Sequence, residues 1–392
     1  MAVEHVILRK PAVAARRFGA TGSAAAEAAS PLIVEIGDLS RAKAAALRRK
    51  KDIAGVARSI PMKLIAPVAR HSSAGEAADS VVTWGVRAVG ADTSPYDGDG
   101  VIVAILDSGI DRSHPAFQGV DIVAKNFTST GDDDEDGHGT HCAATVFGRS
   151  IDGLRIGVAP GVRKALIGKV LAKNEGSSAQ LSNAIQWAVE GGANVISMSL
   201  GFDFPRLVEE LRAEGYPAEL ATSLALEDYR RNLLLFERQA SFIAAIGAFQ
   251  RPALLVAAAG NESRRDVDPD FEIAVSPPAV ADGFISVGAV GPAGGKLVIA
   301  PFSNTGPRVC APGIAVQSAK RGGGLTVMDG TSMATPHVAG VAALWIQKLA
   351  KEEMLTSKSV TDRLAGTATT AALREGFDPL TVGTGLVRAP QE

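Results

Sequence analysis

Four polar side chains occupy positions where they could carry out nucleophilic chemistry. Asp107 ends the apolar run VIVAILD, and Asn261 follows the apolar run LLVAAAG. His138 lies between two glycines in DGHGTHCAATVFG, and Ser332 lies in GTSMATPHVAGVAALW. A carboxylate that orients an imidazole, an imidazole that deprotonates a serine, and an amide that stabilises an oxyanion together make an acyl-transfer site.

Each of these residues also has a structural interpretation when it is taken alone. The Asp and the Asn could form turns after strands, the His could be structural, and Ser332 could simply cap a helix. Pro336 favours the chemical interpretation, because proline is tolerated in the first turn of a helix. It predicts that the helix over residues 335–351 begins beside Ser332, where free N–H groups would favour an oxyanion.

Short, continuously apolar runs recur from residue 98 onward. Runs that are apolar on both faces are typical of a parallel sheet covered by helices. Helical patterns at 180–190 and 335–351 alternate with these runs, which predicts an α/β domain with a mostly parallel sheet sandwiched by helices. The carboxyl ends of such strands are where sites are built. The runs lie at residues 101–106, 165–171, 194–200, 253–259 and 284–290.

The composition changes along the chain and predicts four parts. The part over 31–70 reads as strand, helix, strand, with Ser40 as the N-cap of the helix, and so predicts a small α+β domain. Small polar residues without periodicity predict the linker. The parts are a flexible N-terminal segment over 1–30, in which Val6 to Leu8 are a possible earlier strand, the small domain over 31–70, a linker over 71–83 and the large domain over 84–392.

One connection in the large domain is unusually long. Residues 202–232 contain LVEELRAEG and ELATSLALEDYRR, whose apolar spacing predicts two inserted surface helices. This insertion could narrow substrate access, mediate association or only fill space.

LDSGID, HGTHCA, AAAGN and GTSMATPHVAG together resemble the subtilisin-like serine protease family, from about Trp84 to near the C-terminus. The order Asp, His, Ser is also that of subtilisin. The resemblance implies that Ser332 attacks the scissile carbonyl, His138 moves the proton and Asp107 orients the imidazole. Asn261 and the Ser332 N–H would bind the oxyanion.

The resemblance also implies how substrate is held. Two edge segments would hold an extended peptide by main-chain pairing, so recognition would tolerate many sequences. Ser276, at the position of the primary specificity pocket, is not acidic, so strict cleavage after Lys or Arg is not expected. The DDDED run is either a solvated charge run, or its Asp136, and with it Asp134, favours a basic side chain in the substrate position next to the cleaved bond. The expected substrate-binding residues are Gly176, Ser177, Ser178, Ser199, Leu200, Gly201, Gly260, Ser276 and Asp136.

Many family members bind calcium, but this chain departs from the pattern. Ala116 stands where a carboxylate ligand is expected, and residues 148–155 replace the usual metal loop. We therefore expect no metal or other cofactor at that position, although the DDDED run could supply oxygen ligands. Cys142, one helical turn after His138, is either a small buried side chain or a site for mercurial inhibition.

The small domain is similar to the family's inhibitory propeptide, which implies that this segment is an intramolecular inhibitor cut between about residues 66 and 83. The favoured function is a broad-specificity serine endopeptidase acting on peptides or unfolded proteins. The alternatives are a peptide-maturation protease or transpeptidase, and a catalytically silent peptide-binding module.

Composition restricts partners and location. The 392-residue chain has a formal net charge of -2, which gives no reason to expect nucleic acid or an anionic membrane as partner. No run is long and apolar enough for a membrane span, and no secretory signal is recognisable, so we expect a cytoplasmic protein. Two cysteines form no disulfide framework, and buried thiols are the favoured interpretation.

Overall fold

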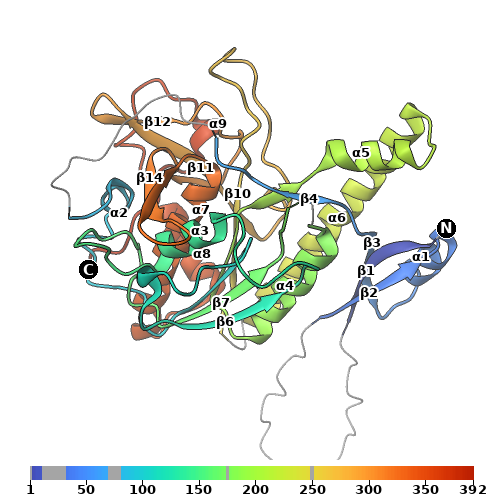
Figure 1. Cartoon of the computed structure of the whole chain (residues 1–392), viewed down its shortest axis with the longest axis horizontal. Helices are drawn as coiled ribbons and strands as arrows, with labels where there is room; N and C mark the ends of the chain where they lie inside the picture. Colours follow the sequence, from blue (N-terminus) through green and yellow to red (C-terminus); the bar gives the residue numbers. More distant parts are fainter. Residues whose placement is uncertain (1, 11–31, 69–80, 174–175, 248–250) are drawn as a thin grey trace, which may run out of the picture.

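The computed structural model describes residues 2–10, 32–68, 81–173, 176–247 and 251–392. Figure 1 shows a large body and a smaller N-terminal domain beside it, joined by a strand, β4, that enters the large body. No helix among these residues is long and apolar enough to cross a membrane.

The five apolar runs form five parallel strands of the central sheet, as the sequence predicts, and β6 and β13 are further parallel strands that it did not predict. Its order is β12-β11-β10-β8-β5-β7-β6, and β13 also pairs with β11. All neighbours run parallel except the β11 and β12 pair. The strands are β5 (Ile102–Asp107), β6 (Asp121–Asn126), β7 (Lys164–Lys169), β8 (Val195–Met198), β10 (Leu254–Ala258), β11 (Phe284–Ala293), β12 (Lys296–Ile299) and β13 (Val309–Pro312).

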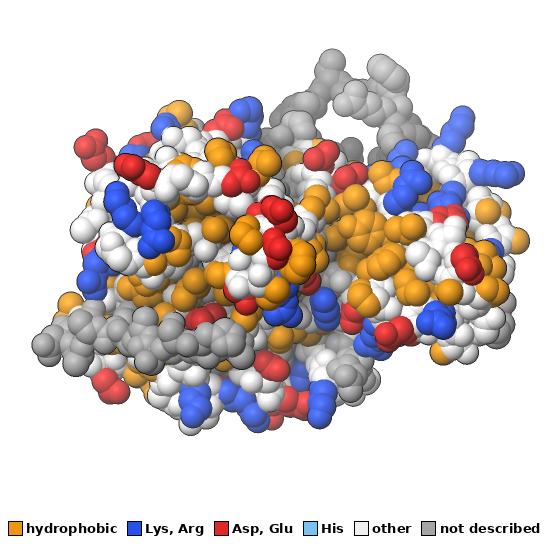
Figure 2. Space-filling view, turned by 90° about the horizontal axis from the view of Figure 1, so that it is seen from above, with side chains coloured by type: hydrophobic (Ala, Val, Ile, Leu, Met, Phe, Trp, Pro, Cys, Tyr) orange, Lys and Arg blue, Asp and Glu red, His pale blue; other side chains and the backbone are white. Residues whose placement is uncertain are grey.

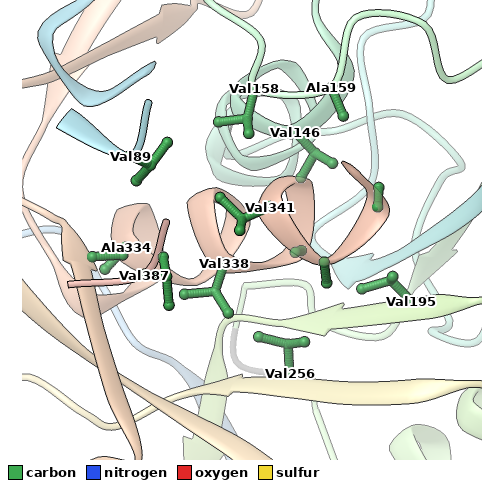
Figure 3. Close-up of a cluster of buried hydrophobic side chains, with 14 of the residues drawn as sticks. Val89, Val146, Val158, Ala159, Val195, Val256, Ala334, Val338, Val341 and Val387 are labelled. Atoms are coloured by element: carbon green, nitrogen blue, oxygen red, sulfur yellow. The ribbon is translucent and has the colours of Figure 1, made fainter. Parts of the chain in front are cut away.

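Alternate side chains of each strand face opposite helical layers. In β5, Val103 and Ile105 pack in the cluster that contains α3 (His138–Phe147) and α7 (Thr331–Lys351). Their neighbours in β5 pack in the cluster that contains α4 (Ser178–Glu190) and α6 (Ala218–Gly247). Figure 3 shows α7 at the centre of the first cluster, with small and branched side chains on every side of it. The predicted sandwich is therefore confirmed.

The N-terminal domain differs from its prediction at two strands. Its antiparallel sheet has the order β2-β1-β3. The central strand β1 (Val3–Arg9) lies within the segment predicted to be flexible, which corrects that prediction for these residues. They are ordered because they pair on both sides, with β2 (Ile33–Leu39) and β3 (Ile53–Arg58). Residues 11–31 lie outside the described residues.

The predicted helix of this domain is α1 (Arg41–Arg48), and the Ser40 side chain caps it by accepting a hydrogen bond from Lys43 N. The apolar run at 62–66 does not join the small sheet. Its first part forms β4 (Met62–Leu64), which pairs with β9 (Leu200–Phe202) of the large body.

The long connection contains two helices, as expected. The first is α5 (Phe204–Ala213), and the second, α6, continues to Gly247, well beyond the predicted end of the insertion. The remaining elements are α2 (Trp84–Ala88), the short 3-10 helix η1 (Pro115–Phe117), the hairpin of β14 (Val316–Ala319) and β15 (Leu325–Met328), α8 (Ser357–Gly366) and α9 (Pro379–Val382).

Two surface and core features follow the composition. Cys142 and Cys310 are free thiols and are buried. Figure 2 shows acidic and basic side chains interspersed over the face seen from above, in keeping with the small net charge. Of the linker predicted over 71–83, residues up to 80 lie outside the described part of the chain, and Val82 forms a β-bridge with Arg155.

Candidate active site

Asp107 and His138 meet at the carboxyl end of β5. The Oδ1 atom of Asp107 lies 2.8 Å from Nδ1 of His138, and both side chains are buried. Two glycines make this approach possible. Gly137 caps α3 with a left-handed φ of 92°, and a Cβ on Gly139 would lie 2.2 Å from the carbonyl oxygen of Gly109. The carboxylate can therefore orient the imidazole and stabilise its cation.

Ser332 is the second residue of α7, not a residue that precedes it. The helix begins at Thr331, so Pro336 lies in the second turn and the predicted start at residue 335 is wrong. The helix tolerates the proline because the carbonyl oxygen of Ser332 has other donors. It accepts hydrogen bonds from Ser199 Oγ at 3.2 Å and from Cys142 Sγ at 3.4 Å.

The N-terminal segment crosses the site in front of these residues. Ser332 Oγ donates a hydrogen bond of 2.7 Å to the carbonyl oxygen of Ile65. Asn261 Nδ2 donates one of 3.0 Å to the carbonyl oxygen of the next residue, Ala66. The other end of the Asn261 amide is fixed, since its oxygen accepts from Thr331 N and Thr331 Oγ1. The serine and the amide thus contact neighbouring carbonyls of one strand.

Main-chain hydrogen bonds hold that strand on both sides. Ile65 N donates to Ser199 O at 3.3 Å, and β4 pairs antiparallel with β9. On the opposite side, Met62 N donates to Gly176 O at 2.9 Å, and Ser178 N donates to Ile60 O at 3.0 Å. The structure therefore brings two predicted edge segments together around one extended peptide. The predicted residues in these edges are Gly176, Ser177, Ser178, Ser199, Leu200 and Gly201.

The other predicted substrate-binding residues have different surroundings. A Cβ on Gly260 would meet Asn304, Glu262 and Ser276 at 2.3 to 3.0 Å, so the backbone is tightly enclosed there. Ser276 Oγ accepts a hydrogen bond from Asn304. Asp136 lines a cavity of about 630 Å³ together with Leu64, the residue before Ile65.

Comparisons with known proteins identify this arrangement. Residues 98–385 match the model of the subtilase family, Peptidase_S8. The chain belongs to the subtilase family. It is 32% identical to a subtilisin of Bacillus pumilus over 289 residues, which are 72% of this chain and 89% of that protein. It is also 32% identical to subtilisin DY of Bacillus licheniformis over 296 residues, 74% and 92% of the two chains.

Solved structures give the same result for the fold. The protease described as prenylagaramide maturation protease PagA superimposes with a TM-score of 0.54 and 27% identity, over 78% of this chain and 96% of that one. An S218A mutant of the protease domain of PatA gives 0.53 and 26%, over 75% and 94%. The subtilase resemblance and the α/β fold are confirmed, and the chain is a serine-type endopeptidase.

Asp134 of this subtilase, considered from the sequence as a substrate-facing acid, is instead a buried structural carboxylate. Asp134, only 1% exposed, accepts hydrogen bonds from the backbone N–H groups of Gly137 and Thr140 and from the hydroxyl groups of Ser108 and Thr140. Ser108 follows Asp107, and its oxygen also accepts from Gly139 N. Asp134 therefore ties the aspartate loop to the first turn of the histidine helix.

Lys169 supports the same loop of the subtilase and was not recognised from the sequence. This lysine, 3% exposed, ends β7 and donates from Nζ to the carbonyl oxygens of Gly131 and Asp133. The signal for Asp134 was weak because DDDED resembles a solvated charge run, and Lys169 is a single basic residue in the apolar run ALIGKVL. The one available sign was an Asp three residues before a Gly at the expected helix start, a pattern that favours a capping turn.

The electrostatics of the site centre on His138. Burial acts to lower the pKa of His138, but the Asp107 carboxylate and the neighbouring Cys142 together outweigh burial and raise that pKa well above its usual value. Burial lowers the pKa of its neighbour His141 to about 3. His138 Nε2 is buried and has no hydrogen-bond partner among the described residues, because the Ser332 hydroxyl is directed at Ile65.

The described residues contain one close group of three potential metal ligands, and it includes the proposed catalytic pair. Asp107, His138 and Cys142 have ligand atoms within 4.8 Å of one another. The Cys142 Sγ lies 3.8 Å from His138 Nδ1, and burial raises the pKa of this thiol. Ala116 is buried in η1, with no side-chain oxygen to offer a calcium ion.

Proposed function

We propose that this subtilase is a broad-specificity endopeptidase made as a self-inhibited precursor, and that it cuts its own Ile65–Ala66 bond. One observation carries the proposal. The Ser332 hydroxyl lies 2.7 Å from the carbonyl oxygen of Ile65, within a strand that is paired on both sides like a substrate. This bond lies at the N-terminal limit of the range expected from the sequence.

The same residues support a full acyl-transfer cycle. Ser332 Oγ attacks the carbonyl carbon of Ile65 while His138 Nε2 takes its proton, and Asp107 stabilises the resulting imidazolium. The Asn261 amide and the Ser332 N–H stabilise the oxyanion. Collapse breaks the Ile65–Ala66 bond as His138 protonates the leaving amine, and water then hydrolyses the acyl-enzyme.

The precursor arrangement stops short of this reaction, which supports self-inhibition. The Ser332 hydroxyl donates to the carbonyl it must attack, and not to His138 Nε2. The Asn261 amide holds the carbonyl of Ala66, one residue beyond the proposed oxyanion. Reaction requires the hydroxyl to turn to His138 and the amide to reach Ile65. Because both groups must leave their present hydrogen bonds first, we expect slow self-cleavage and continued occupation of the cleft.

Broad specificity is supported by how the strand is held. The contacts at Gly176, Ser178 and Ser199 use main-chain atoms, which every peptide provides. Ile65 is 3% exposed, so a buried apolar side chain occupies the position before the proposed cleavage. We therefore expect apolar residues to be accepted at the cleaved position, without a requirement for Lys or Arg.

Intact masses of the wild type and of the Ser332→Ala variant test the proposal. The wild type should lose residues 1–65 and present Ala66 as its new N-terminus, while the variant stays whole. A cut that also appears in the variant would assign it to another protease. If both chains stay whole and neither reacts with a fluorophosphonate probe, the site serves only for peptide binding.

Peptide maturation is the second candidate function. It is favoured by the similarity in structure to PagA, whose description calls it a maturation protease. Product analysis with a peptide substrate and an added amine nucleophile separates the two candidates. Hydrolysed acid as the sole product supports the endopeptidase, and a ligated or cyclised product supports the maturation enzyme.

A further inference from the structure

The small sheet of the N-terminal domain rests on α4 and α6, and the apolar part of this contact is small. Val6 and Leu8 of β1 and Ala57 of β3 pack against Ala179 of α4 and Leu235 of α6. Figure 1 shows the N-terminal domain beside α6. Both helical residues lie outside the insertion at 202–232.

The insertion contributes polar contacts to the same domain. Arg58, the last residue of β3, forms an ion pair of 3.1 Å with Glu214 at the C-terminal end of α5. The carbonyl oxygen of Arg58 accepts a hydrogen bond of 2.8 Å from Asn232 Nδ2, and Asn232 is fully buried. The insertion therefore holds both the side chain and the main chain of one residue.

Charge complementarity extends beyond this pair. The N-terminal domain presents Arg41, Arg48 and Arg58, and these line one cavity of about 590 Å³ with acidic side chains of the insertion. The acidic residues are Glu214, Glu227 and Asp228. Burial raises the pKa of Asp228, and the nearby Arg58 acts in the opposite direction. Arg231 of the insertion lines the same cavity and is paired with Glu227 of its own helix, so opposite charges face each other across the contact chiefly at Arg58, Glu214 and Asp228.

Cavities flank the contact and limit what apolar packing can contribute. A second cavity, of about 700 Å³, lies between β3 and α6 and is lined by Ile53, Val56, Leu234 and Phe242, among others. Loosely packed apolar surface gives little selectivity, whereas paired charges and a buried amide give orientation and partner choice. The polar contacts are therefore suited to selecting this domain over another small sheet.

We propose that the insertion at 202–232 is a recognition element for the chain's own N-terminal domain, which it keeps docked on α4 and α6. The proposal rests on the proposed function in one respect, that the docked domain is the inhibitor. Cleavage at Ile65–Ala66 leaves the contacts of Arg58 intact. The cut domain consequently stays bound until ionic strength or a competing protein weakens the charge pairs.

Amide hydrogen exchange of full-length Ser332→Ala chains tests the recognition role without requiring activity. Glu214→Lys should speed exchange in β1 and β3 about tenfold, because it replaces an attraction to Arg58 by a repulsion. Glu209→Lys is the matched control, an equal charge reversal at an exposed position of the same helix. Arg58→Glu should repeat the effect, and the swap Arg58→Glu with Glu214→Arg should restore slow exchange.

Two results would overturn the proposal. Equal exchange rates in Glu214→Lys and Glu209→Lys would show that the ion pair of Arg58 with Glu214 does not contribute to docking. A charge-swapped variant that folds normally but does not restore slow exchange would show that charge pairing is not the cause. Asn232→Ala gives a second, uncharged test, with the same expected direction. Helix content by circular dichroism confirms that each variant is folded.

Size-exclusion chromatography of the processed wild type separates this proposal from the proposed function. Residues 1–65 should co-elute with the large body at low salt and separate at high salt. If no cut occurs, the proposed self-cleavage is wrong. The hydrogen-exchange result then still decides whether the insertion recognises the N-terminal domain. If the fragment separates at low salt after a normal cut, recognition by the insertion is wrong and self-processing stands.

Discussion

The N-terminal part of the chain contacts the large body in two places, and the two contacts differ in kind. In the cleft, residues 60–66 are held by main-chain pairing with two strand edges. On the helices, the small sheet is held by side chains, including the ion pair of Arg58 with Glu214. Main-chain pairing accepts many sequences, whereas paired side chains accept few. The difference suggests that a tolerant cleft needs a selective inhibitor contact elsewhere.

The comparison predicts that changes in the cleft alter reaction rate and leave docking unchanged. The largest effect is expected for Asp107→Asn, which keeps the geometry but favours the wrong imidazole tautomer. Turnover of a peptide substrate should fall about 10⁴-fold, as it does in other serine proteases with this triad. Amide protection of β1 and β3 should match that of the wild type. Lost protection would show that the two contacts are coupled.

Asn261→Ala should have the next largest effect. If the amide stabilises the oxyanion, kcat should fall about 10²- to 10³-fold with little change in KM. Removal of the oxyanion-hole asparagine of subtilisin has an effect of this size. The measurement is steady-state kinetics on a peptide ester. A normal kcat would assign oxyanion stabilisation to backbone N–H groups alone.

Asp134→Asn probes the loop that joins the aspartate to the histidine helix. An amide cannot accept all the hydrogen bonds of this buried carboxylate, and its NH2 group would face N–H donors. We expect about 1–3 kcal/mol of lost stability and a kcat lowered by about tenfold or more. Chemical denaturation and kinetics measure the two effects. Asp132→Asn, an exposed change in the same acidic run, is the control.

The pH dependence of self-cleavage tests the role of His138 in the cleft. His138 must be neutral to accept the serine proton, and its pKa in the precursor is raised above the usual 6.5. The cleavage rate should therefore increase with pH and reach half its maximum above pH 6.5. The raised pKa also stabilises the folded precursor. This contribution is complete at pH values below the pKa of His138 in the unfolded chain, and it is lost as pH rises through the pKa of His138 in the folded chain. A midpoint below 6.5 would contradict the assignment.

The smallest effect concerns Leu64, the residue before Ile65 in the bound strand. Leu64, Glu135 and Asp136 line the same cavity, and Lys173 and Arg206, which also line it, reduce the attraction for a basic side chain. Matched peptides with Lys or Ala at the position of Leu64 should differ a few-fold in kcat/KM in favour of Lys, and salt should reduce the difference. Equal cleavage of the two peptides would leave the acidic run without a role in specificity.

The sequence predicted the sheet because its strands are buried on both faces and read as continuous apolar runs. It also located the polar residues at strand and helix ends, since those ends meet at one edge of the sheet. The family motifs are local in the chain, so no tertiary information was needed to recognise them.

The remaining features depend on contacts between distant segments. The strand β3 has the sequence IAGVAR, whose Gly and Ala give little local preference for a strand. It forms because β1 pairs with it and α6 covers it. Asp134 was hidden in an acidic run, since only the fold reveals that one of five adjacent acids is buried. The start of α7 was misjudged because the donors that satisfy Ser332 come from Ser199 and Cys142.

Ser199 links the two sides of the cleft. Its carbonyl oxygen accepts from the backbone N–H of Ile65, while its hydroxyl donates to the carbonyl oxygen of Ser332. One residue is therefore hydrogen-bonded both to the bound peptide and to the residue that attacks it, and so helps to fix the separation between them. The carbonyl it uses is open to it because Pro336 has no N–H to occupy that oxygen. By leaving that carbonyl oxygen free, a proline in the second turn of α7 allows Ser199 to hold Ser332 at a set distance from the bound peptide.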